Sequence, residues 1–448
     1  MLADGQPLAE RLTGDPATAT KEAMTAELWI IGTLVTFCGT EFFLERALAW
    51  ANARRVAARG GRVPDVFEGS IDGATGRRSA EYTLARTRFG HIAATYDLGL
   101  LLVVLFSGFL PWLKLTLEGA GLSGLPLGVA FWLAALWAIS IAGLPLAWHE
   151  TFRIEARFGF NKTTPKIFCI DVLKGWLVSA LLGAPLLLAV LWLIGAAGGS
   201  WWLWGAGLVI GFQALMMVIY PLWIAPLFNK FTPLADGSLR EKLSALAAKA
   251  NFSARGIFVM DGSRRSTHSN AYFTGFGKSR RIVLYDTLVN ELPEDELAAV
   301  LAHEIGHYKK GHVPMMLALS AAMVIAGFAV ADHLLGWQAF YRAFGFASPW
   351  APAGLFLLAQ VSGAFTFWLK PVINALLRRF EHEADAYAAH LTGAPDWLRA
   401  ALLKLAEKNL TNLWPHPAYS LYHYSHPPLA ERLERLRCPG PPEQHNKR

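Results

Sequence analysis

The sequence predicts an all-α polytopic membrane protein with a small α+β domain inserted between two groups of membrane-spanning helices. Three observations lead to this class. Hydrophobic residues make up 54% of the 448 residues and charged residues only 17%, too little charge to cover a soluble protein of this size. The mean hydropathy is positive, at +0.32. Apolar runs recur on both sides of one long polar stretch, residues 226–312.

Seven apolar runs are long enough to cross a bilayer, which takes roughly 20 helical residues. The residues before the first run, 1–26, carry charges and no apolar core, so we expect no cleavable signal peptide there. We place the seven spans at about 27–50, 94–117, 126–148, 172–197, 201–225, 313–336 and 350–372.

These spans divide the chain into four regions. Residues 1–225 form an N-terminal membrane region with five spans, and 226–312 form the insert. Residues 313–372 hold the sixth and seventh spans, and 373–448 form a C-terminal segment. We expect the insert and the C-terminal segment to supply the chemistry, since both carry clusters of histidines and carboxylates.

Positive charges fall in alternate loops, which predicts the orientation of the chain. The segment 51–91 carries eight arginines, whereas 118–125 carries neither arginine nor lysine. The segment 149–171 and the insert are basic again, and 337–349 has a single arginine. Because positive loops stay cytoplasmic, we expect the N-terminus outside and the insert and C-terminus inside. The net charge of +7 then reflects these loops and not a nucleic-acid partner.

The insert has the pattern of a small α+β unit. SLREKLSALAAKAN (238–251) has leucines spaced three and four apart, as in an amphipathic helix. GIFVMDG (256–262) predicts a short strand, and SNAYFTGFGKSRRIVLYDTL (269–288) predicts two strands joined by a glycine-containing turn. PEDELAAVLAHEIGHYKKGH (293–312) predicts a helix, with proline and acidic residues suited to its first turn.

That last helix carries a metal-binding motif. His303 and His307 are four residues apart, with Glu304 directly after the first. Helix positions four apart face the same way, so both imidazoles can bind one ion. HExxH on a helix indicates a zinc metalloprotease with the glutamate as general base, and such a site needs a third protein ligand. The alternative is an ordinary helix with an accidental motif. His312 falls on the opposite face from His303, so we expect a loop or interface residue there.

RRFEHEADAYAAHL (378–391) offers the third ligand. Glu381 and Asp385 are four apart and share a helix face, whereas Glu383 points nearly away from Glu381. Only one of the two glutamates can therefore face the metal, and we expect Glu381. Asp385 would accept a hydrogen bond from a ligand histidine and fix its tautomer. Without HExxH nearby, the same run would indicate a solvated acidic helix face.

HEIGH followed by FEHEAD resembles the zinc site of the type I CAAX prenyl endopeptidases, integral-membrane metalloproteases of the gluzincin type. The similarity covers roughly 150–437 in register, and before that it rests on hydropathy. Leu377 departs from the family pattern, where we expect Ser, but it does not touch the proposed ligand. Four further stretches resemble the family in the same order: IEARFGFNKTT (154–164), PLFNKFTPL (226–234), SRRSTHSNAYFTGFGKSRRIVLYDTL (263–288) and YSHPPLAERLERL (424–436).

The resemblance implies an arrangement for the whole chain. Seven transmembrane helices would form a barrel around a large water-filled chamber, and a small zinc-protease domain would close its cytoplasmic side. Glu41, Glu45 and Arg46 lie inside the first predicted span. They suit such a chamber, because charged groups at membrane depth face water or a partner.

The resemblance also implies roles for residues that spacing alone does not assign. Asn270, Ala271 and Tyr272 would form a strand that pairs with the substrate backbone. His426 and Arg432 would lie at the active site, where a histidine N–H could stabilise the oxyanion of the reaction. From the residues alone, a plain edge strand and a loop histidine before Pro-Pro remain the alternatives.

We therefore expect a membrane-embedded zinc metalloendopeptidase that cuts peptides or protein C-termini, lipidated or not. The composition, rich in Ala, Gly and Arg, favours a bacterial inner membrane. One alternative is a quality-control protease like the bacterial heat-shock zinc peptidases, which share HExxH and ExxAD but have fewer spans. A metal-containing transporter is the other, although paired halves with broken helices are not evident. The substrate and the oligomeric state stay open at this stage.

Overall fold

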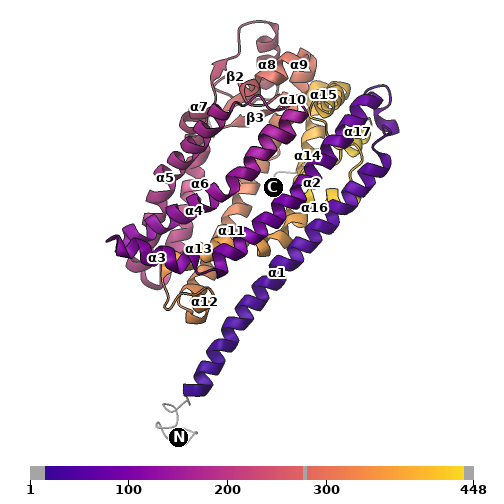
Figure 1. Cartoon of the computed structure of the whole chain (residues 1–448). Helices are drawn as coiled ribbons and strands as arrows, with labels where there is room; N and C mark the ends of the chain where they lie inside the picture. Colours follow the sequence, from indigo (N-terminus) through magenta and orange to yellow (C-terminus); the bar gives the residue numbers. More distant parts are fainter. Residues whose placement is uncertain (1–15, 276–279, 438–448) are drawn as a thin grey trace, which may run out of the picture.

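Seven long helical segments dominate the computed structural model, which describes residues 16–275 and 280–437. They run side by side along one long axis, and the insert lies at one end of the bundle they form (Figure 1). Each is long and apolar enough to cross a membrane, as the sequence predicts. The seven segments are Met24–Arg59, Gly73–Phe106, Gly124–Glu155, Pro165–Ala196, Gly198–Phe228, His312–Leu335 and Ala351–Thr392.

Local signals set several helix starts. Asp72 accepts a hydrogen bond from the Thr75 N–H, and Thr164 accepts one from the Ile167 N–H, so two helices begin with side-chain caps. The helices of the membrane region are α1 (Pro16–Arg59), α2 (Gly73–Phe106), α3 (Phe109–Gly119), α4 (Gly124–His149), α5 (Pro165–Ala196), α6 (Trp201–Ile219), α7 (Ala225–Phe228), α11 (His312–Leu335), α12 (Gln338–Arg342) and α13 (Ala351–Thr366).

The second span differs from the sequence prediction of 94–117. The helix ends at Phe106, and Gly108 adopts a left-handed backbone with φ of +81° before α3 begins. Leu110 of α3 is fully buried in a cluster with Phe131. The hydropathy pattern predicted one span where the structure has two helices, because apolar residues continue through the turn between them. The left-handed conformation that breaks the helix is one that glycine adopts readily, and hydropathy does not register it.

The seventh span continues into the C-terminal segment. After α13, one 3₁₀ turn at Phe367–Leu369 leads directly into α14 (Lys370–Thr392), which carries Glu381. The membrane helix α13 and the metal-site helix α14 therefore form a nearly continuous helix. The remaining C-terminal helices are α15 (Pro395–Lys408), α16 (Pro417–His423) and α17 (Leu429–Arg437).

The charges of the first span face the interior of the bundle. Glu45 lies 3.3 Å from Lys370 Nζ, at the start of α14, and 3.4 Å from His423 Nε2 in the C-terminal segment, so it has two basic partners. Arg46 donates to the backbone carbonyls of Gly90 and His91. Cavities of about 430 and 380 Å³ lie beside these two residues. The expectation that such charges have polar partners is met.

The insert forms a four-stranded mixed sheet with helices around it. The strand order is β1-β2-β4-β3; β2 and β4 are parallel, and the outer pairs are antiparallel. Strand β1 was not predicted from the sequence, and the turn expected between β3 and β4 includes 276–279, outside the described residues. The elements are β1 (Phe231–Pro233), α8 (Ser238–Lys249), β2 (Ile257–Met260), β3 (Ala271–Thr274), β4 (Arg281–Tyr285), α9 (Asp286–Glu291) and α10 (Glu294–Lys309).

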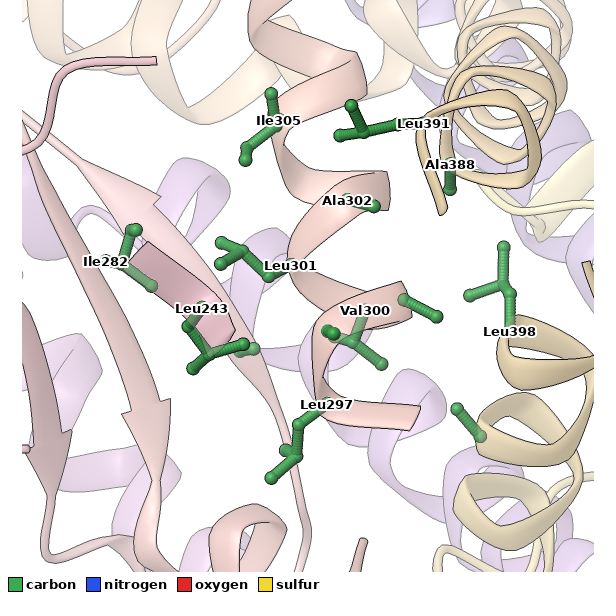
Figure 2. Packing of buried hydrophobic residues seen from close by; sticks show 14 of the residues in the cluster. Leu243, Ile282, Leu297, Val300, Leu301, Ala302, Ile305, Ala388, Leu391 and Leu398 are labelled. Atoms are coloured by element: carbon green, nitrogen blue, oxygen red, sulfur yellow. The ribbon is translucent and has the colours of Figure 1, made fainter. Parts of the chain in front are cut away.

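Helix α10 is the core of this unit. Figure 2 shows Leu301 facing Leu243 of α8 and Ile282 of β4, while Ala388 of α14 and Leu398 of α15 lie on the other side of the helix. All five side chains are buried. Burying a leucine contributes about 1.5–3 kcal/mol, so packing on two sides holds the HExxH helix in place.

Gly306 sets how closely α10 approaches α14. A Cβ atom added there would lie 3.0 Å from Ala384 Cα and 3.1 Å from the Ala384 carbonyl oxygen. Both are backbone atoms, which cannot rotate away. The two helices therefore touch through a residue without a side chain, and this contact lies one residue before His307.

We predict that Gly306→Ala destabilises the protein. Alanine gains about 1 kcal/mol of helix propensity over glycine, but overpacking costs about 1–3 kcal/mol, so the net loss is up to about 2 kcal/mol. Thermal unfolding in detergent measures it. Gly327→Ala in α11 is the matched control, since no described heavy atom lies within 4 Å of its added Cβ; an equal response of both variants would contradict the prediction.

Candidate metal centre

Three residues from two helices converge on one point. His303 and His307 lie one turn apart on α10, and Glu381 faces them from α14. His303 Nε2 lies 3.5 Å from Glu381 Oε2, and His307 Nε2 lies 3.2 Å from Glu381 Oε1. The two Nε2 atoms are 3.2 Å apart. One ligand atom from each of the three residues lies within 4.8 Å of the other two, so a single ion can contact all three.

The group fits a divalent metal. Glu381 Oε2 is buried, and no hydrogen-bond partner for it exists among the described residues, an arrangement that is costly unless a cation fills it. Two imidazole nitrogens and one carboxylate oxygen are a ligand set typical of catalytic zinc sites. The geometry thus brings together the three residues that the sequence proposes as ligands.

Asp385 and Arg432 lie directly behind this group. Asp385 Oδ1 is 2.9 Å from His303 Nδ1, on the side of the ring away from Glu381. Arg432 donates to both oxygens of Asp385, at 2.8 and 2.7 Å. Burial acts to lower the pKa of His303, but the contacts with Asp385 and Glu381 outweigh it and raise that pKa to about 9. The local potential is therefore negative and favours a cation.

Glu304 follows His303 on α10. Burial raises the pKa of its carboxyl above the ordinary value, which makes the carboxylate a better proton acceptor. Glu304 is partly buried and interacts electrostatically with His303, His307 and Glu381. Its role as general base, which the sequence indicates, stays a prediction.

His426 reaches the same group from the loop before α17. Its Nε2 lies 3.3 Å from Glu381 Oε1, and 63% of its side chain is exposed, so it can contact a substrate. A cavity of about 320 Å³ adjoins it. Arg432 is different, since it is buried and its guanidinium is held by Asp385, with Nη1 3.5 Å from Glu381. It can orient the carboxylates, and it also lines this cavity, but its side chain is far less exposed than that of His426.

The proposed substrate strand is at the edge of the sheet. Ala271 pairs with Leu284 and Tyr272 with Val283 in β3, the last strand in the order. Asn270 is exposed, and its side-chain oxygen accepts the N–H of the next residue. Strand β3 contacts α10, so its free edge lies on the insert beside the HExxH helix.

A partly buried polar network that was not predicted from the sequence fixes the loop before β3. His268 Nδ1 lies 3.0 Å from Asn409 Oδ1, and His268 Nε2 lies 3.4 Å from Glu155 Oε2. Ser269 donates to Glu291 at 2.7 Å. These partners come from α4's π-helical extension, α9 and the end of α15, so the loop joins three regions of the chain. The two partners of His268 lie more than 100 positions away in the sequence, so no local pattern indicated these contacts.

The structure agrees with the expectation for Glu383 and differs from the expectation for His312. Glu383 lies 3.1 Å from His312 Nε2 and points away from the ligand group, as the helix geometry predicts. His312 was expected on the opposite helix face from His303, as a loop or interface residue; it is instead the first residue of α11, and its Nδ1 lies 2.9 Å from His307 Nδ1. Helix α10 ends at Lys309, and Gly311, with φ of +73°, redirects the chain before α11, so extrapolating one helix face to residue 312 was wrong.

Comparison with protein families assigns both halves of the chain. A model described as "CAAX prenyl protease N-terminal, five membrane helices" matches residues 53–230. A second, "Peptidase family M48", matches residues 233–439. The second match contains every residue of the ligand group and its surroundings.

Curated relatives and a solved structure agree with these matches. The chain is 40% identical to a CAAX prenyl protease 1 homolog of Oryza sativa over 385 residues, which covers 84% of this chain and 90% of that one. It is 31% identical to the human CAAX prenyl protease 1 homolog, covering 92% and 96%. The crystal structure of S. mikatae Ste24p superimposes with a TM-score of 0.85 at 33% identity, covering 90% and 98%. The predicted class, seven membrane helices around a chamber with a small α+β domain, is confirmed.

We predict that Glu381→Ala strongly lowers the metal content of the purified protein, because two imidazoles alone leave the ion short of a ligand. Elemental analysis after size exclusion measures it. Glu383→Ala is the matched control on the same helix and should keep more metal than Glu381→Ala. Full occupancy in Glu381→Ala would move the third ligand elsewhere.

Proposed function

The chain belongs to peptidase family M48 and is an integral, multi-pass membrane metalloendopeptidase, and from that premise we propose that it hydrolyses peptide bonds with zinc held by His303, His307 and Glu381. The observation that carries this proposal is the convergence of three ligand atoms within 4.8 Å, one of them on a buried carboxylate whose Oε2 has no hydrogen bond among the described residues. Zinc is the metal proposed because a site of two histidines and one glutamate is typical of zinc peptidases.

The residues around the ion divide the work. A bound divalent metal would supply Lewis acidity and a water of lowered pKa. Glu304 would accept the proton of the attacking water as the water oxygen bonds to the peptide carbonyl carbon, and would return that proton to the amine that leaves when the C–N bond breaks. His426, exposed beside Glu381, donates an N–H to the carbonyl oxygen as it becomes negative.

Asp385 and Arg432 act as positioning residues in this proposal. Asp385 accepts from His303 Nδ1, which leaves Nε2 free to bind the metal. Arg432 holds both oxygens of Asp385 and so fixes the direction of that acceptor. A two-point guanidinium–carboxylate pair is more rigid than a single contact.

For the substrate we propose a protein C-terminus of the CAAX type, with or without an attached prenyl chain. The names of the relatives support the substrate class. The backbone of an extended substrate would add to the free edge of β3 at Asn270, Ala271 and Tyr272. Strand addition supplies main-chain hydrogen bonds without reading every side chain, which suits substrates that differ in sequence.

The quality-control protease remains the second candidate, but it is less favoured. The match of residues 53–230 to a five-helix N-terminal family model accounts for the long membrane half that bacterial heat-shock peptidases lack. A transporter is not supported, because the chain is a metalloendopeptidase. The relatives described above are eukaryotic, so composition is the sole support for a bacterial inner membrane.

We further propose that the insert faces the cytoplasm, because the basic loops flank it. In a cysteine-free background, Ser123→Cys in the loop before α4 should react with a membrane-impermeant maleimide on intact cells. Ala235→Cys, an exposed position in the insert, should react only after the membrane is opened. The reverse pattern would invert the proposed orientation.

We predict that Glu304→Gln keeps metal but loses peptide hydrolysis by at least about 100-fold, since general-base catalysis contributes about 10²–10⁴-fold. The assay follows release of the last three residues from a farnesylated C-terminal peptide by mass spectrometry, with a chelator-treated sample as reference. An unprenylated twin of the peptide tests whether the lipid matters. Unchanged hydrolysis by the variant would remove Glu304 as the base.

A further inference from the structure

His312, which is not one of the proposed ligands, contacts the proposed ligand His307 on the side of the ring that faces away from the metal site. His312 Nδ1 lies 2.9 Å from His307 Nδ1, the ring nitrogen opposite the one that faces Glu381. On its far side, His312 Nε2 lies 3.1 Å from Glu383 Oε2. Arg379 Nε then donates to the other oxygen of Glu383 at 2.8 Å. Four side chains thus form a continuous line that ends on the ligand.

The middle of this line is held rigidly. His312 is 3% exposed, and its ring stacks on Phe380 with centroids 4.1 Å apart and planes 10° apart. It is the first residue of α11, directly after the left-handed Gly311. A ring that is buried, stacked and anchored at a helix start cannot swing freely, so its nitrogens point in fixed directions.

The chemistry of the ligand fixes the direction of each hydrogen bond. A neutral imidazole that binds a metal through Nε2 carries its proton on Nδ1, so His307 Nδ1 must donate to His312 Nδ1. His312 must then carry its own proton on Nε2. That N–H points at Glu383, which accepts. Every donor in the line meets an acceptor.

We propose that His312 and Glu383 form a positioning relay that sets the ring orientation and tautomer of His307 for metal binding. The proposal rests on the metal site proposed above and adds to it a second residue pair with no direct contact to the ion. His303 is oriented by a carboxylate that touches it, whereas His307 is oriented by a carboxylate acting through another imidazole. The two ligands are therefore supported by different means.

Two substitutions separate an acceptor role from a packing role. His312→Phe keeps a flat ring that can stack on Phe380 but has no acceptor for His307. His312→Asn loses the ring but places an amide oxygen close to the former Nδ1, where it can accept the same N–H. If the acceptor at position 312 orients His307, the asparagine variant should bind the metal more tightly than the phenylalanine variant, although phenylalanine fits the space better.

The measurement is zinc affinity of the full-length protein in detergent, by competition with a chelator of known affinity. We expect His312→Phe to weaken binding about 10–100-fold, the usual effect of losing a group that orients a ligand. His312→Asn should recover part of that loss. Glu383→Gln should weaken binding less than His312→Phe, because its amide oxygen can still accept. At saturating zinc, kcat should recover more in His312→Asn than in His312→Phe.

Controls keep each outcome decisive. His390→Phe, an exposed histidine on α14, should bind zinc like the unmodified protein, and circular dichroism checks folding. If His312→Phe does not fold, the zinc affinities of His312→Asn and Glu383→Gln still test the relay. Wild-type affinity in His312→Phe, or equal losses in both His312 variants, would overturn the relay. Full binding by Glu381→Ala would instead overturn the metal site itself, and the relay with it.

Discussion

The close contact between α10 and α14 is the constraint on which the rest of the structure depends. Gly306 lies against the backbone of Ala384, and this approach places Glu381 within 3.5 Å of both imidazoles. The sheet packs on one side of α10 and α15 on the other (Figure 2), so the helix has no freedom to retreat. Because α14 continues the seventh membrane segment, the metal site is tied mechanically to the bundle (Figure 1).

Carboxylates are concentrated at the site where a cation would bind. Glu304, Glu381 and Asp385 bring three carboxylates together, and Arg432 is the one guanidinium among the described residues that lies at hydrogen-bond distance from them. Burying uncompensated charge costs several kcal/mol of free energy per ion. A bound divalent ion would lower the free energy of burying these carboxylates. Asp385 and Glu381 raise the pKa of His303 against the effect of burial, so the potential at this ring favours positive charge.

Much of the fold and the metal site could be predicted from the sequence, because both rest on local periodicity. Hydropathy gave seven spans, and the spacing within each helix separated Glu381 from Glu383. What failed depended on backbone turns or distant contacts. Gly108 breaks an apolar run that hydropathy joined, and Gly311 returns His312 to His307. The contacts of His268 with residues more than 100 positions away leave no periodic trace.

Anomalous X-ray diffraction from crystals of the full-length protein, recorded on both sides of the zinc absorption edge, tests the central claim most directly. The account predicts a single strong difference peak between the Nε2 atoms of His303 and His307 and the carboxylate of Glu381. A peak at a site that excludes residue 381, or a fully active protein without any peak, would contradict it.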